Sequence, residues 1–145
     1  MIKNLSKIEK HLIESDILRA DDTYISDGCI LVAKEFLDNK VLKAYKTDDC
    51  NLMELIPYES GRDWELPEYA RLAPHKQLWF EINADDRVNY KYIELFMDSV
   101  SGVDIVTFSI VEAKLSYPYP VPIVKVWCND KFMGVIMSAT NSTLN

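Results

Sequence analysis

The stretch YISDGCILVA, residues 24–33, carries the clearest structural signal in the sequence. Two runs of β-favouring residues flank Asp27 and Gly28. Asp-Gly between such runs is typical of a β-hairpin, because a tight type I′ turn needs positive φ at both central positions. We therefore expect two antiparallel strands, 23–26 and 29–33, joined by Asp27 and Gly28.

An amphipathic helix is predicted on the N-terminal side of this hairpin. Apolar residues between 2 and 13 recur at three- and four-residue spacing, so they share one helix face. Ser6 and Glu9 have the spacing of a capping box, which would place the helix start at Ser6. A start at Asn4 fits the sequence equally well.

The second half of the chain predicts a strand, a helix and three further strands. Apolar and polar residues alternate over 78–84, as in a half-buried strand. A helix follows from Asn89, its cap, to residue 100, and Gly102 is the expected stop. The three closing strands are predicted at 103–111, 121–128 and 132–139, the last two joined by a short hairpin connection, 129–131.

The remaining segments give weaker signals. Residues 41–46 and 52–56 are candidate strands, and 57–77 is predicted to be a long surface connection because it holds three prolines and Gly61. Three prolines in 116–122 exclude a central strand there. The expected fold class is α+β, with two amphipathic helices packed on antiparallel sheet.

Composition favours one domain. A chain of 145 residues with 48% apolar residues can build one core. We divide the domain, 1–145, into a first helix-and-strand half, the connection, a second such half and a polar tail: 1–56, 57–77, 78–139 and 140–145. The expected location is cytoplasmic, because no apolar run resembles a signal or a membrane span.

Motifs for enzyme chemistry are not recognised. His11 and His75 are predicted to be isolated exposed histidines, the three cysteines to be structural thiols, and adjacent pairs such as Asp21-Asp22 to be solvated turns. No glycine-rich phosphate loop is present. The prediction is a protein without catalytic residues, cofactor or metal.

The net charge of −7 is unevenly distributed. Residues 1–46 carry 8 basic and 8 acidic residues, which cancel, so the whole excess lies in 47–145. An acidic surface repels nucleic acid in general and suits a basic partner. Acidic and aromatic residues gather in and near the connection, and we predict a protein interface from them: Asp48, Asp49, Asp63, Trp64, Glu65, Glu68, Tyr69, Tyr117 and Tyr119.

Two stretches resemble the bacterial sliding-clamp superfamily (DNA polymerase processivity factors), including phage proteins with clamp-like domains. They are the hairpin at 24–32 after an amphipathic helix, and 89–139, a helix followed by three strands with aliphatic residues running into Met137. The resemblance covers about half the chain and implies a duplicated helix-plus-strands arrangement. Cys29 stands where the family favours histidine, and Ser138 where proline often follows the methionine.

In clamps the helices face the encircled DNA and are basic. The resemblance therefore implies that DNA-facing residues would be Lys3, Lys7, Lys10 and Lys91, although Glu94 and Asp98 oppose them. The predicted function is a binding module, of a kind that phages encode, that engages DNA weakly or replication proteins and can self-associate. The alternative is an acidic inhibitor, or DNA mimic, that blocks a basic nucleic-acid-binding protein.

Overall fold

The computed structural model describes residues 5–45, 51–66, 79–83, 85–113 and 121–140. The elements of the first half are α1 (Lys7–Ile13), β1 (Arg19–Ala20), β2 (Tyr24–Ser26), β3 (Ile30–Ala33), η1 (Lys34–Phe36), α2 (Lys40–Ala44), η2 (Leu52–Leu55) and β4 (Arg62–Trp64). Those of the second half are β5 (Trp79–Glu81), β6 (Asp86–Asn89), α4 (Tyr90–Asp98), β7 (Val106–Ala113), β8 (Val121–Cys128), β9 (Lys131–Met137) and β10 (Ala139–Thr140).

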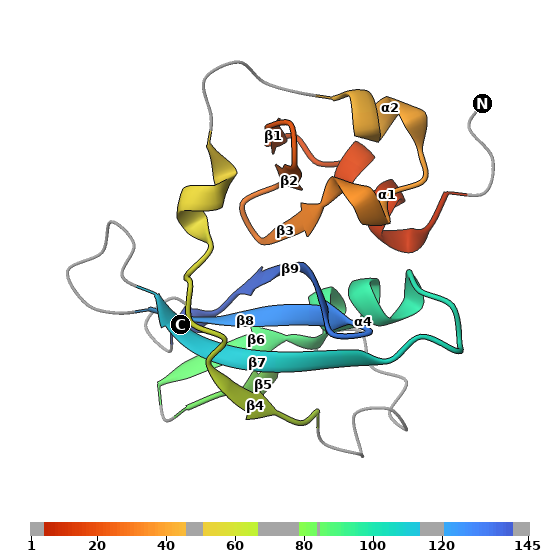
Figure 1. Ribbon diagram of the computed structural model, residues 1–145. Helices are drawn as coiled ribbons and strands as arrows, with labels where there is room; N and C mark the ends of the chain where they lie inside the picture. The colour runs from red at the N-terminus through yellow and green to blue at the C-terminus, as the bar shows by residue number, and fades with distance from the viewer. Residues whose placement is uncertain (1–4, 46–50, 67–78, 84, 114–120, 141–145) are drawn as a thin grey trace.

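Two antiparallel sheets and two main helices make up the fold, which confirms the α+β class (Figure 1). The larger sheet has seven strands in the order β1-β2-β3-β9-β8-β7-β4, and the smaller has three in the order β10-β6-β5. The predicted clamp-like duplication is not confirmed. Strands from both halves of the chain pair with each other in the large sheet, since β3 pairs with β9 and β7 with β4.

The main core lies between the large sheet and the layer formed by α1, α4 and the small sheet. Ile8 of α1 and Phe96 of α4 are fully buried there, with Phe80 of β5 and Phe108 of β7. A smaller cluster on the opposite face of the large sheet includes Leu52 of η2. The large sheet is therefore covered on both faces over part of its area.

Several predicted boundaries are confirmed by local hydrogen bonds. Ser6 and Glu9 form the capping box of α1, which selects the Ser6 start over Asn4. Asn89 caps α4 by accepting a hydrogen bond from the Lys91 amide at 2.9 Å. However, α4 ends at Ser99, so the predicted stop at Gly102 is wrong.

Both predicted hairpins are present, but the tight turn is at the other one. Between β2 and β3 only Gly28 has positive φ, and the Asp27 side chain instead accepts hydrogen bonds from the amides of Cys29 and Ile30. Asn129 and Asp130, between β8 and β9, both have positive φ, 51° and 65°. The chain therefore uses the two-residue turn at Asn-Asp and a longer loop at Asp-Gly.

The weak strand predictions at 41–46 and 52–56 are wrong. Residues 40–44 form α2 because Asn39 caps the amides of Val41 and Leu42, and Leu42 is buried. Residues 52–55 form the short helix η2. In 41–46 the Asn39 cap and the burial of Leu42 outweigh the weak strand signal, whereas η2 has no side-chain cap and buries Leu52.

The predicted connection and the proline-rich segment also contain strands. Residues 62–64 of the predicted connection form β4, which pairs with β7. Residues 86–89, which lie outside both segments, form β6, a strand that was not predicted. Gly61 precedes β4 with φ of +79°, and a Cβ there would lie 2.2 Å from the carbonyl oxygen of Ile110. Pro122, excluded from a central strand, lies in β8 opposite Glu112. Residues 139–140 form β10 in the small sheet.

Candidate functional site

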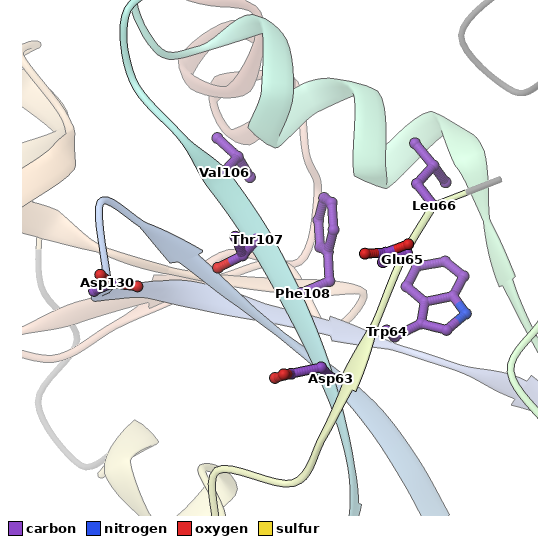
Figure 2. Close-up of a pocket in the computed structure, with 8 residues that line it drawn as sticks. All are labelled: Asp63, Trp64, Glu65, Leu66, Val106, Thr107, Phe108 and Asp130. Atoms are coloured by element: carbon purple, nitrogen blue, oxygen red, sulfur yellow. The ribbon is translucent and has the colours of Figure 1, made fainter. Parts of the chain in front are cut away.

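An open groove of about 510 Å³ lies at the edge of the large sheet. Figure 2 shows it between the β4 segment on one side and β7 with the β8–β9 turn on the other. Its lining residues come from three elements that are distant in the sequence: Asp63, Trp64, Glu65, Leu66, Val106, Thr107, Phe108 and Asp130.

The groove exists because β4 separates from β7 after three residue pairs. The last pair is Trp64 with Phe108, and the next residues, Glu65 and Leu66, are no longer in the strand. The rings of Trp64 and Phe108 pack edge to face with centroids 6.0 Å apart, and both belong to the main core. The apolar side of the groove is thus held in place by the core.

Carboxylates supply the polar side of the groove. Asp63 and Glu65 are exposed and point to the same side of β4, opposite to Trp64, as Figure 2 shows. Asp130 is also exposed and sits in the left-handed region at the β8–β9 turn. Three negative charges therefore border one groove with an aromatic wall.

The nearest basic side chains are engaged elsewhere. Arg62 donates from Nη2 to the carbonyl oxygen of Ile82 at 2.5 Å, and Lys131 forms an ion pair with Glu35 at 3.0 Å. Within the part of the chain that the structure describes, Asp63, Glu65 and Asp130 form no ion pair and no side-chain hydrogen bond. Among the described residues, no basic side chain neutralises these three charges.

The structure brings together three of the predicted interface residues, Asp63, Trp64 and Glu65. The others lie outside the described residues: Asp48, Asp49, Glu68, Tyr69, Tyr117 and Tyr119. Sequence reasoning missed Thr107, Phe108 and Asp130. The Asn129-Asp130 pair was a usable signal, because both residue types tolerate the left-handed conformation that projects a tight turn from the end of a sheet.

The four lysines predicted to face DNA, Lys3, Lys7, Lys10 and Lys91, are called the lysine row below, and the structure describes part of it. Lys3 lies outside the described residues, whereas Lys7 and Lys10 are exposed on α1 and Lys91 on the adjacent α4. Lys7 forms a 2.9 Å ion pair with Asp98 of α4, and this hydrogen bond and charge raise the pKa of Lys7. Lys91 lies over the Tyr92 ring, 5.4 Å from its centroid.

His11 is not an isolated histidine, which corrects the prediction. Its Nε2 lies 2.6 Å from Oδ2 of Asp27, so the ring joins α1 to the β2–β3 loop. Burial, followed by the neighbouring Cys29 thiol, raises the pKa of Tyr92, whose ring packs edge to face on His11. His75 lies outside the described residues.

The cysteines differ from one another. Cys29 is exposed, which contradicts the prediction of a structural thiol. Cys128 is buried, and burial raises the pKa of its thiol. Cys50 is among the residues not described. In the described ranges, no group of three His, Cys, Asp or Glu side chains is placed to hold a metal ion.

Two other grooves lie near the same end of the sheet, and within the described residues each has fewer carboxylates without an ion pair than the groove at β4 and β7. One, of about 400 Å³, contains the ion pair between Lys131 and Glu35. The other, of about 430 Å³, contains Asp104, which accepts a hydrogen bond from Nδ2 of Asn129 at 2.9 Å. The groove at β4 and β7 is therefore the best candidate for a charged ligand.

Comparisons with protein-family models, curated proteins and solved structures find no match for this chain. Among the described residues, no helix is both long and apolar enough to cross a membrane.

Proposed function

We propose that this chain is a non-catalytic binding module whose groove between β4 and β7 receives a basic segment of another protein. The observation that carries the proposal is the border of three carboxylates, Asp63, Glu65 and Asp130, which have no ion-pair partner among the described residues, around an aromatic wall. Interfaces are anchored by aromatic side chains and gain specificity from complementary charge. The proposal corresponds to the predicted acidic inhibitor in the kind of partner that is bound, and it does not specify the activity of that partner.

Trp64 supplies the apolar part of such a contact. Its ring is half-buried, so one part packs on Phe108 while the rest faces the groove. The aliphatic stem of a lysine or arginine covers apolar surface while its charged end reaches a carboxylate. The groove therefore offers a basic segment both apolar surface and negative charge, on opposite sides of β4.

DNA binding through the lysine row, implied by the clamp resemblance, has less support. Lys7 is paired with Asp98, which cancels one of the charges the row would offer to phosphate. Glu94 adds a further negative charge to α4, the helix that carries Asp98 and Lys91. Each unpaired cation contributes one counterion-releasing phosphate contact, so an incomplete row predicts weak and salt-sensitive DNA binding.

The expected affinity effect follows from the exposure of the three carboxylates. Exposed ion pairs contribute about 0.2–1 kcal/mol each. Neutralising all three removes roughly 0.6–3 kcal/mol, which corresponds to about 3- to 150-fold in affinity. Because the charges are at the surface, added salt weakens binding in the same direction.

The test is selection of a random peptide library on the immobilised protein at low salt. We expect enrichment of peptides rich in Lys and Arg, and loss of their binding to a groove variant carrying Asp63→Asn, Glu65→Gln and Asp130→Asn. A matched control removes the same charge at exposed positions away from the groove, with Glu14→Gln, Asp16→Asn and Glu54→Gln.

The two variants separate a local site from a general charge effect. If the control loses as much binding as the groove variant, net charge alone attracts the peptides and the groove has no role. Enrichment of acidic or purely apolar peptides would also reject the proposal. Duplex DNA serves as a second probe, and retention of DNA by the wild-type protein at physiological salt would favour the lysine row instead.

A further inference from the structure

The strand beside the groove, β4, is the last strand of the large sheet. The sheet order ends at β4 on one side and at β1 on the other. Among the described residues, no strand pairs with the outer edge of β4. An edge of this kind presents unpaired N–H and C=O groups and can accept an added strand.

The hydrogen bonds of Ile105 show which peptide groups face this edge. The Ile105 carbonyl accepts a hydrogen bond from the Asn129 amide at 2.8 Å, and its own amide donates to Oδ1 of Asn129 at 2.9 Å. Both groups of Ile105 thus point towards the β8 side. Since peptide groups alternate along a strand, those of Phe108 and Ile110 point towards β4.

The same alternation can be followed into β4. Trp64 lies opposite Phe108 and Arg62 opposite Ile110, so both residues exchange hydrogen bonds with β7. Asp63, between them, therefore directs its N–H and C=O away from the sheet. The outer edge thus offers a backbone donor and acceptor at the residue that also carries a groove carboxylate.

Charge identifies the occupant of this edge. A second copy pairing through the same edge would bring Asp63 and Glu65 close to their own counterparts, and like charges opposite each other destabilise a strand pair. A segment with lysine or arginine at these positions gains cross-strand ion pairs instead. The opposite edge of the sheet, β1, carries exposed Arg19 and has no such preference for a cation.

We infer that the basic partner segment binds as an added strand on the outer edge of β4, an inference that rests on the proposed function. Basic residues occupy alternate positions, beside Asp63 and Glu65. The residue between them is apolar and lies beside Trp64 on the other face of the sheet. The backbone of the basic residue opposite Asp63 exchanges hydrogen bonds with Asp63.

Four synthetic peptides with blocked ends and the same composition of Lys, Val and Thr, the third and fourth differing only in which residues are N-methylated, test the inference by fluorescence anisotropy. One alternates Lys with Val or Thr, and one groups all lysines together. The third and fourth repeat the alternating sequence with N-methyl groups, placed on the Lys residues in the third and on the Val and Thr residues in the fourth. Methylation removes an amide donor without changing the charge.

The alternating peptide should bind at least about fivefold more tightly than the grouped one, because a lysine run that reaches both Asp63 and Glu65 also places a lysine, in place of an apolar residue, beside Trp64. Methylation of its Lys residues should weaken binding by about tenfold or more, whereas methylation of Val and Thr, whose amides face solvent, should have little effect. The reverse methylation pattern would overturn the inference.

Other results separate the inference from the proposed function. If both peptides bind equally, are insensitive to methylation and lose affinity to the groove variant, charge attraction remains and strand addition is rejected. If none binds more tightly to the wild-type protein than to the groove variant, both proposals fail. A dimer of the chain that excludes the alternating peptide, detected by light scattering, would assign the edge to a second copy and overturn the inference.

Discussion

Asp21→Asn should destabilise the packing of η2 on the smaller core cluster, which lies on the opposite face of the large sheet from the main core. Oδ1 of Asp21 accepts hydrogen bonds from the amides of Thr23 at 2.8 Å and Tyr24 at 2.7 Å, and Oδ2 accepts one from the Leu52 amide at 2.9 Å. The carboxylate thus joins the β1–β2 turn to η2, whose Leu52 is buried. Asparagine keeps the shape but has only one oxygen acceptor.

The cost can be worked out from these three bonds. With the amide oxygen in the Oδ1 position, the bonds from Thr23 and Tyr24 remain, but an NH₂ group then faces the Leu52 amide. A hydrogen bond to a charged acceptor contributes about 1.5–3 kcal/mol. Because Asp21 is only partly buried, water replaces some of this, and we expect a loss of about 1 kcal/mol. The urea midpoint should fall by roughly 0.5 M.

The loss should depend on pH with a defined sign. Burial would raise the pKa of Asp21, but the amide hydrogen bonds from Tyr24, Thr23 and Leu52 outweigh it and hold the pKa below its ordinary value of 3.8. A depressed carboxyl pKa stabilises the folded state at neutral pH, and that contribution is lost as pH falls through the folded pKa. The difference between wild type and variant should therefore shrink below pH 3.8.

Urea unfolding of the wild type, Asp21→Asn and Asp22→Asn measures this pH dependence. The series runs from about pH 7 down to about pH 3, which extends into the range where carboxyl groups titrate. Asp22 is exposed and accepts no hydrogen bond within the described residues, so it is the matched control. Equal destabilisation by both variants, or a difference that does not change with pH, would refute the role assigned to the Asp21 carboxylate.

Three further predictions concern stability. Gly134→Ala should lower the free energy of unfolding by at least about 2 kcal/mol in urea titrations, because its Cβ would lie 2.2 Å from the Leu31 carbonyl oxygen and 2.8 Å from the Phe96 ring. Ser6→Ala should cost about 1 kcal/mol in the same assay by removing the cap of α1. Burial lowers the pKa of Lys125 below 10.5. The contribution of Lys125 to the free energy of unfolding should therefore rise with pH between its pKa in the folded state and 10.5. Lys125→Met should flatten this alkaline dependence in thermal melts.

Elements with local signals were predictable from the sequence. The capping box at Ser6 and the cap at Asn89 each depend on residues within three positions, so the chain fixes them without reference to the rest of the fold. The tight turn was expected at Asp27-Gly28, but the structure has it in the predicted hairpin connection between β8 and β9. Its two residues, Asn129 and Asp130, both tolerate positive φ.

Elements that depend on distant pairing were not predictable. Strand β4 has three residues, two of them charged, and forms because Gly61 lets the chain approach Ile110 of β7. Periodicity cannot detect so short a strand. The lysine row shows the same limit, because its spacing on α1 predicts a basic stripe but not the ion pair of Lys7 with Asp98, 91 residues away.

The candidate site joins both kinds of information. Composition alone indicated Asp63, Trp64 and Glu65 as an interface, but only the pairing of β4 with β7 adds Phe108, and only the β8–β9 turn adds Asp130. The same pairing decides that alternate residues of β4 differ in role. Trp64 is bound to β7 and to the core, whereas Asp63 has both its side chain and its peptide group directed outward.

A short acidic edge strand has two consequences that reinforce each other. Its charges oppose pairing of this edge with an identical edge. The same charges favour a basic strand, so protection against one partner is selection for another. Asp63 contributes to both effects, so Asp63→Lys should weaken binding of the alternating lysine peptide. The same variant should bind a peptide of the same pattern with glutamate in place of lysine, which the wild-type edge repels. A variant that still prefers the lysine peptide would show that Asp63 does not set the charge preference.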